Sequence, residues 1–213
     1  MNELDNSPLL IGIDPSESLN LLRYFGDYIG VASTDWAAID RRSHATRSSH
    51  GHPRAFEDGP VRSSWLDTWT EALNRMDQRH QSGWSLLEHG PAEVAERKAL
   101  VSSYSFVDLL GDDLHRLWNR CAGRAQRWWS ADGGAKDAVL QDLYSSELLE
   151  MLRHYSKNAA SPIDSHRQLV IILADDVVVR GLSSHTCLIS SSAVRSPWLA
   201  WGLIHQFLVA PST

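Results

Sequence analysis

The sequence predicts an α/β protein: a small, mainly parallel sheet flanked by helices, with a helical insertion between the first strand and the C-terminal strands. Three observations support this class. A short apolar run at residues 8–13 is followed at once by residues that start helices. A continuous apolar run at residues 168–174 is rich in branched side chains, which is typical of a strand buried on both faces. Long stretches between the two runs follow the 3.6-residue period of helices.

The first apolar run is expected to be a strand that leads directly into a helix. Asp14 is expected to cap this helix, with Pro15 at its first position and Glu17 reaching back toward the cap. Apolar residues then recur at helical spacing until Gly30, where the glycine ends the run.

The middle of the chain is predicted to be a loop followed by the helical insertion. Residues 40–63 lack any apolar period and are rich in Ser, Arg, His, Gly and Pro, so we expect a long polar loop there. The insertion then covers residues 64–160. Its predicted helices, the first of which begins just inside the loop, span residues 62–80, 91–100, 112–128 and 136–155.

The C-terminal part returns to strands. Residues 168–174 form the buried strand, residues 186–189 a second strand, and residues 197–208 a closing helix. The length of 213 residues fits one domain, so we expect a single domain over residues 1–213.

Composition narrows the function classes. A net charge of −6 disfavours a general nucleic-acid binder, and no apolar run is long enough to span a bilayer. The first residues do not read as a secretory signal, so a cytoplasmic location is expected. Two cysteines, Cys121 and Cys187, cannot form a metal cage alone and are expected to be buried, inert thiols. Nine tryptophans supply large apolar area for a core or an interface, and no cofactor is expected.

Three carboxylates follow predicted strands. Ligands of open α/β sheets bind beyond the carboxyl ends of the strands, where Asp14, Asp175 and Asp176 lie in the sequence. Together they could hold a cation or a ribose hydroxyl. The alternative, which we favour, is that Asp14 caps a helix and the other two form a turn.

Two further groups of residues could carry chemistry, but neither forms a complete site. The histidines of the polar loop could bind a metal, but no cysteine accompanies them, and we interpret them as solvated. These residues are His44, His50 and His52. Ser184, His185 and Cys187 combine a nucleophile with a base, but no third group is specified. No metal site is therefore predicted.

One predicted helix carries a stripe of arginines opposite its apolar face. They are Arg116, Arg120, Arg124 and Arg127. Guanidinium groups along one arc could hold an acidic partner, although Asp112 and Asp113 neutralise part of the charge. The alternative is an ordinary solvated helix face.

The segment 187–207, CLISSSAVRSPWLAWGLIHQF, resembles part of the TIR-like domains over about a tenth of the chain. In that family a strand ends in Ser or Thr, and a Ser-x-Trp motif opens a helix; Ser196, Trp198 and Trp201 match this pattern. The resemblance implies a flavodoxin-like parallel sheet. NAD-cleaving members carry a glutamate on this helix that engages the ribose. Gly202 occupies the matching position, so the resemblance implies a rearranged or inactive relative.

Three functions follow from these observations. The first is a non-enzymatic protein-binding module of a bacterial defence, toxin-immunity or related complex. Its partner, another protein, would contact the arginine stripe together with Trp198 and Trp201. The first alternative is a TIR-like NAD-nucleotide-binding protein or pseudo-enzyme. The second is a metal-dependent hydrolase that uses Asp14, Asp175 and Asp176.

Overall fold

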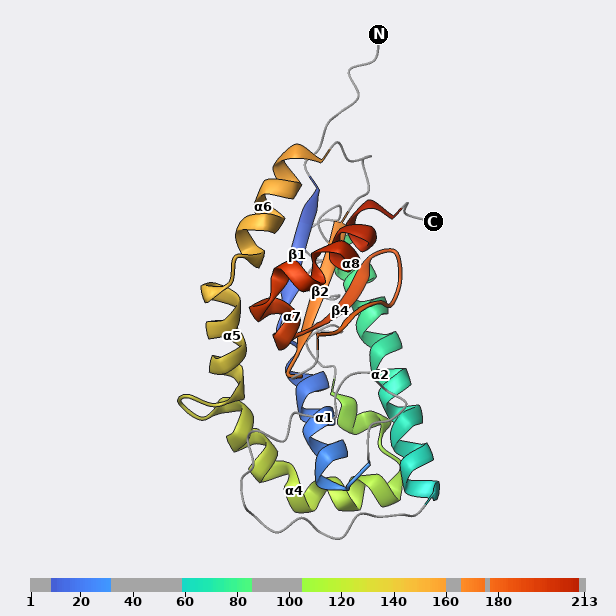
Figure 1. Ribbon diagram of the computed structural model, residues 1–213. Coiled ribbons are helices and arrows are strands. Elements are labelled where there is room, and N and C mark those ends of the chain that lie inside the picture. Colours follow the sequence, from blue (N-terminus) through green and yellow to red (C-terminus); the bar gives the residue numbers. More distant parts are fainter. Residues whose placement is uncertain (1–8, 32–58, 86–104, 160–165, 175–176, 211–213) are drawn as a thin grey trace, which may run out of the picture.

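The structure is a computed structural model that describes residues 9–31, 59–85, 105–159, 166–174 and 177–210, and its core is a four-stranded sheet (Figure 1). The strands are β1 (Leu10–Asp14), β2 (His166–Ile172), β3 (Val179–Gly181) and β4 (Thr186–Ser190). Their spatial order is β1-β2-β4-β3; β1, β2 and β4 run parallel, and β3 runs antiparallel to β4. The predicted α/β class, with a mainly parallel sheet, is confirmed.

β2 is a central strand, as its apolar run predicted. Residues 167–172 are all buried, and β1 and β4 pair with β2 on either side. In the middle of the sheet, Leu169 lies between Ile13 of β1 and Cys187 of β4. A strand with neighbours on both edges and helices on both faces favours apolar side chains on both of its faces, which explains the unbroken run from Leu169 to Ile172.

Alternate side chains of β2 enter two different cores. Val170 and Ile172 face a core built with the helices that follow β1, whereas Leu169 and Ile171 face a core built with the later helices. The helices of the first core are α1 (Glu17–Tyr28), α2 (Gly59–Ser85), the 3₁₀ helix η3 (Phe106–Leu109) and α4 (Asp112–Ser130). The helices of the second core are α5 (Ala135–Ser145), α6 (Leu148–Asn158), α7 (Ser191–Arg195) and α8 (Pro197–Val209).

Aromatic side chains fill the first core. Trp65 and Trp69 stack with ring centroids 5.5 Å apart, and Trp118 meets Phe25 edge to face at the same centroid distance. α1 and α2 approach closely because Gly26 has no side chain; a Cβ there would lie 2.6 Å from the Trp65 ring. These tryptophans are therefore structural, and they account for much of the unusual count.

Asn20 joins α1 to the end of β2. Its side chain is fully buried, and its amide group donates to the carbonyl of Ser16 at 2.8 Å and to that of Ile171 at 3.2 Å. The amide oxygen accepts the N–H of Leu173 at 2.7 Å. Since buried backbone groups must find partners, this one side chain completes the hydrogen bonding where β2 ends.

The prediction that Asp14 caps the first helix is wrong. Asp14 is the last residue of β1, and Ser16 is the N-cap, whose hydroxyl accepts the N–H of Leu19 at 3.4 Å. The carboxylate of Asp14 instead lies 3.5 Å from Nε2 of His80 on α2. Both Asp and Ser are good caps, and strand pairing with β2 decides which one serves.

The loop predicted over residues 40–63 is too long at its C-terminal end. α2 begins at Gly59, with Pro60 in its first turn where a missing N–H costs nothing, and continues to Ser85 rather than to residue 80. Residues 40–58, with the three loop histidines, and the predicted helix at residues 91–100 lie outside the described residues.

The helix predicted over residues 136–155 is two helices. α5 ends at Ser145 and α6 begins at Leu148. Ser146 is extended, and its hydroxyl donates to the carbonyl of Val194 and accepts the N–H of Leu148 at 3.0 Å. A serine that bonds backbone groups in this way competes with the helix, which explains the break.

The sheet also contains one strand that was not predicted. β3 has three residues, of which Arg180 and Gly181 are exposed, so it lacks the apolar signal of β2. The strand predicted at residues 186–189 is confirmed as β4, and that at residues 168–174 is β2, shifted two residues toward the N-terminus. No helix within the described ranges combines the length and the apolar character that crossing a bilayer requires.

Candidate functional site

Helix α8 presents the largest group of exposed apolar side chains. Within the described part of the chain seven large apolar residues are exposed, and four of them lie on α8. They are Trp198, 70% exposed, Leu199, 76%, Leu203, 51%, and Val209, 53%. At 100° per residue they fall within an arc of about 140° on one side of the helix. We call these four residues the α8 surface.

The α8 surface carries no charge. The helix reads PWLAWGLIHQFLV and contains neither acidic nor basic residues apart from His205. Gly202 lies inside the exposed arc, and a Cβ built there would meet nothing within 4 Å. The opposite side of the helix is buried through Ala200, Ile204 and Phe207. Gln206 is exposed within the arc and His205 beside it, but the other side chains of α8 are apolar on both sides, which is unusual for a helix that covers a sheet.

Trp198 is held in place although it is exposed. Its indole Nε1 donates to Oε2 of Glu147 at 2.6 Å, and Glu147 precedes α6. A large ring fixed by a hydrogen bond loses little freedom when it is covered, and such rings are typical anchors of protein interfaces. Trp201 differs, because it is half-buried and meets Tyr155 of α6 edge to face at 6.3 Å. The structure thus places only the first of the two predicted tryptophans on the surface.

The C-terminal end of α8 is fixed to the sheet by a buried arginine. Nη2 of Arg167 donates to the carbonyl of Ala210 at 2.6 Å, and its guanidinium lies 5.8 Å from the ring centre of Phe207. Burial lowers the pKa of Arg167 from its ordinary value. A cation at a helix C-terminus also favours the helix dipole, so the α8 surface rests on a rigid support.

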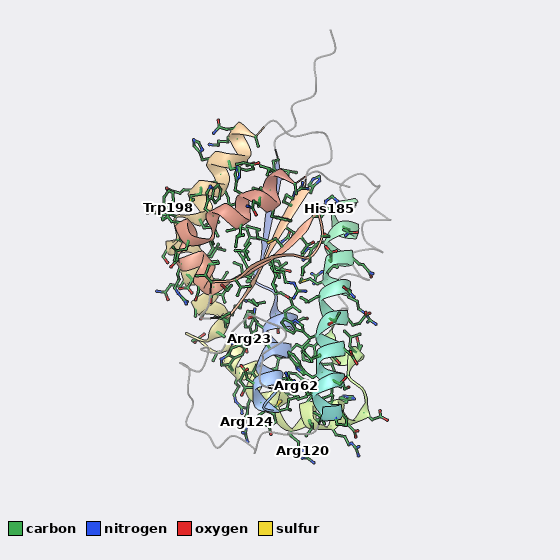
Figure 2. The ribbon with its side chains drawn as sticks, turned by 45° about the vertical axis from the view of Figure 1, so that its right-hand side comes forward. Arg23, Arg62, Arg120, Arg124, His185 and Trp198 are labelled. Atoms are coloured by element: carbon green, nitrogen blue, oxygen red, sulfur yellow. The ribbon has the colours of Figure 1, made fainter. Side chains whose placement is uncertain are left out.

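The four arginines of the predicted stripe are all exposed on α4. Arg116 pairs with Asp113, one turn earlier in the same helix. Figure 2 shows Arg120 and Arg124 at one end of the molecule and Trp198 toward the other. The predicted contact residues therefore form two separate surfaces rather than one.

The carboxylate cluster is described only in part. Asp14 lies at the end of β1 beside His80, whereas Asp175 and Asp176 are outside the described residues. In the ranges that the structure covers, no three side chains of His, Cys, Asp or Glu lie close enough together to hold a metal ion. His80 comes from a helix more than sixty residues after Asp14, and no sequence pattern connects the two residues.

Serines fill the space where β4 ends. Ser190 caps α7 by accepting the N–H of Ala193 at 3.1 Å, and it also accepts the N–H of Val178 at 3.0 Å. Ser191 and Ser192 both donate to the carbonyl of Ala174, at 3.1 Å and 2.8 Å. These hydroxyls tie the link after β2 to the start of α7, so all three serve the fold.

The suggested group of Ser184, His185 and Cys187 does not assemble around a reactive thiol. Cys187 is fully buried in the second core, and His185 precedes β4 with Nδ1 3.3 Å from the carbonyl of His166. Burial raises the pKa of the Cys187 thiol to about 12, and it does the same for Cys121 in the first core. Both thiols are buried, as predicted, and both are held in the neutral form.

These thiols should make the protein less stable at alkaline pH. Above the ordinary thiol pKa of 9.0 the unfolded chain loses protons that the native state keeps up to about pH 12. The free energy of unfolding should therefore fall by about 1.4 kcal/mol per pH unit for each thiol in this window. Urea unfolding at pH 8, 9 and 10 measures the slope, and the double variant Cys121→Ala, Cys187→Ala should show a shallower one. Equal slopes for the wild type and the double variant would contradict the raised pKa of the two buried thiols.

Comparison of the chain with protein-family models, with curated proteins and with solved structures gives no match in any of the three. The functional argument therefore rests on the geometry above. The sequence pointed to Trp198, but not to Leu199, Leu203 and Val209. Their signal is a closing helix without acidic or basic residues apart from His205.

Proposed function

We propose that this chain is a non-enzymatic protein-binding module, and that the α8 surface is where a partner protein docks. The observation that carries the proposal is the exposure of Trp198, Leu199 and Leu203 on an uncharged helix. Single exposed apolar residues are common, but several gathered on one face of a helix mark an interaction site. The fixed ring of Trp198 supplies an aromatic anchor of the kind that dominates interface energies.

The shape of the α8 surface favours an apolar helix of the partner. α8 is a regular helix of 13 residues, which corresponds to a length of about 20 Å. Gly202 leaves a gap between Trp198 and Leu203, so the side chains of a second helix can enter it. Since α8 offers no charge, charged groups of the partner would have to lie at the rim, where they remain solvated.

The proposal is tested by placing a charge in the α8 surface. The tagged chain is isolated from its native host as wild type, as Leu203→Glu and as the control Asn119→Glu, which adds the same charge at an exposed position of α4. Because covering an unpaired carboxylate is costly, Leu203→Glu should reduce recovery of the partner at least about tenfold. Asn119→Glu should recover as much partner as wild type. Equal recovery with all three chains would exclude the α8 surface as the docking site.

The identity of the recovered partner tests the finer prediction. We propose a bacterial defence or toxin-immunity complex from the sequence alone, and a toxin or another defence protein bound through α8 would support it. If the recovered protein is a second copy of this chain, the purified wild type should be a dimer by light scattering and Leu203→Glu a monomer. The TIR-like and metal-dependent alternatives stay predictions. In the TIR-like alternative, Gly202 stands where the NAD-cleaving members of the family carry a glutamate.

A further inference from the structure

A hollow outside the α8 surface lies between α2 and the edge strand β3. It has a volume of about 250 Å³ and lies on the side of the sheet that α2 covers. The buried side chains of Trp69 and Leu73 line it, together with Leu182. The more exposed Asp77 and Arg180 add one negative and one positive charge. The lining is mixed, because polar groups contribute at least as much of it as the apolar side chains. A hollow of this kind offers contacts to one apolar side chain and to a polar neighbour.

The outer edge of β3 offers backbone groups beside this hollow. The carbonyl of Val178 accepts the N–H of Ser190 at 3.0 Å, and the N–H of Leu182 donates to Thr186 at 2.8 Å. Even-numbered residues of β3 therefore face β4. Because the direction alternates along a strand, the N–H and C=O groups of Val179 and Gly181 point toward the free edge.

No strand of the described sheet pairs with this edge, because β3 is the last of its four strands. The sheet face at Gly181 is open as well, since a Cβ built there would meet nothing within 4 Å. Exposed edges are normally kept short or charged so that they do not pair at random. β3 has three residues including Arg180, so it is protected against random pairing while still offering two positions for a specific one.

Asp77 indicates the charge of the ligand. One carboxylate oxygen accepts the hydroxyl of Ser183 at 2.7 Å, and the other accepts the amide of Gln81 at 3.0 Å. These neutral groups fix the carboxylate without cancelling its charge, and no salt bridge to it occurs among the described residues. The net charge of −6 of the whole chain also favours a positively charged ligand. A lysine or arginine of the ligand would therefore be favoured next to Asp77.

We propose that an extended, basic segment of a partner protein adds to the sheet as a strand beside β3. Its backbone pairs with Val179 and Gly181, one apolar side chain enters the hollow against Trp69 and Leu73, and a neighbouring basic side chain reaches Asp77. Backbone pairing supplies affinity in this binding mode, and the side-chain pocket supplies selectivity. The site is separate from the α8 surface and does not depend on it.

The probe for this site is a peptide selected from a displayed library of random nine-residue sequences on the wild-type protein. The selected peptide is synthesised with a fluorescent label, and its dissociation constant is measured by fluorescence anisotropy. Gly181→Pro removes one outward N–H and leaves the pairing with β4 intact, because that N–H faces away from β4. Gly181→Ala is the matched control, since it keeps the N–H and its Cβ meets no atom.

We expect selected peptides to alternate apolar residues with others and to contain lysine or arginine. Gly181→Pro should weaken binding about tenfold, as a lost hydrogen bond and a misaligned strand require, and Gly181→Ala less than about twofold. Asp77→Asn should weaken binding and reduce its dependence on salt. Methylating alternate backbone nitrogens of the peptide should abolish binding to the wild type, which tests strand pairing even if Gly181→Pro does not fold.

Several results would overturn this proposal. One is a selection that yields no binding peptide, and another is a peptide that binds Gly181→Pro as tightly as Gly181→Ala. A third is a set of acidic peptides. Leu203→Glu should leave peptide binding unchanged; if it abolishes binding, the peptides occupy the α8 surface, and the strand-addition site is wrong while the proposed function stands.

Discussion

Replacing Trp65 with alanine should destabilise the protein more than any other prediction here, by about 3–5 kcal/mol. The side chain is fully buried, it stacks on Trp69, and its ring fills the gap left by Gly26 of α1. Its removal would leave a cavity between α1 and α2 that the two backbones cannot close without moving. Urea unfolding followed by far-ultraviolet circular dichroism measures the loss without relying on tryptophan fluorescence.

The matched control for this variant is Trp198→Ala, which removes the same side chain from an exposed position. It deletes one hydrogen bond to Glu147 but creates no cavity, so the free energy of unfolding should change by less than about 1 kcal/mol. A large loss with Trp198→Ala and a small one with Trp65→Ala would show that the tryptophans have been assigned to the wrong surfaces. The pair therefore separates core tryptophans from interface tryptophans.

Asn20→Leu should cost about 2–4 kcal/mol although leucine is similar in size and more apolar. The change leaves the N–H of Leu173 and the carbonyl of Ile171 without the partners that Asn20 provides, in a place that water does not reach. Burial of a leucine side chain cannot compensate for two unpaired backbone groups. Urea unfolding at pH 7 gives the difference.

Asn119→Leu serves as the control for the same change of residue type. Asn119 is exposed on α4, so its replacement should alter the free energy of unfolding by no more than about 0.5 kcal/mol. If Asn20→Leu proved as mild as Asn119→Leu, the contact between α1 and the end of β2 would have to be different from the one described. The link between the first helix and the sheet would then need revision.

The sheet could be predicted where burial leaves a pattern in the sequence. β2 is covered on both faces, so its residues from Leu169 to Ile172 are all apolar, and the run at 168–174 stood out. β3 could not be found, because its three residues are selected by pairing with β4 and two of them are exposed. The prediction of Asp14 rather than Ser16 as the helix cap was wrong for a similar reason. Asp14 pairs with β2 as part of β1, and this pairing between distant segments leaves no pattern in the local sequence.

The candidate surfaces were harder to predict than the fold. α8 has apolar residues on all sides and only His205 and Gln206 as polar ones, so the sequence could not indicate which side packs on the sheet and which carries Leu199 and Leu203. The site beside β3 joins Trp69 and Asp77 of α2 to Arg180, more than a hundred residues later, and no local pattern connects them. In contrast, the arginine stripe was visible because one helix contains it entirely.

The most direct test of the central claim, that the α8 surface docks a partner protein, is site-specific photo-crosslinking. A photoreactive amino acid is placed at position 199 or 203 on α8, or at position 119 on α4, and the chain is irradiated in its native host. Positions 199 and 203 should each give one crosslinked product of defined mass, and position 119 should give none. If position 119 reacts with the same protein as efficiently, or if neither α8 position gives a product, the α8 surface is not the docking site.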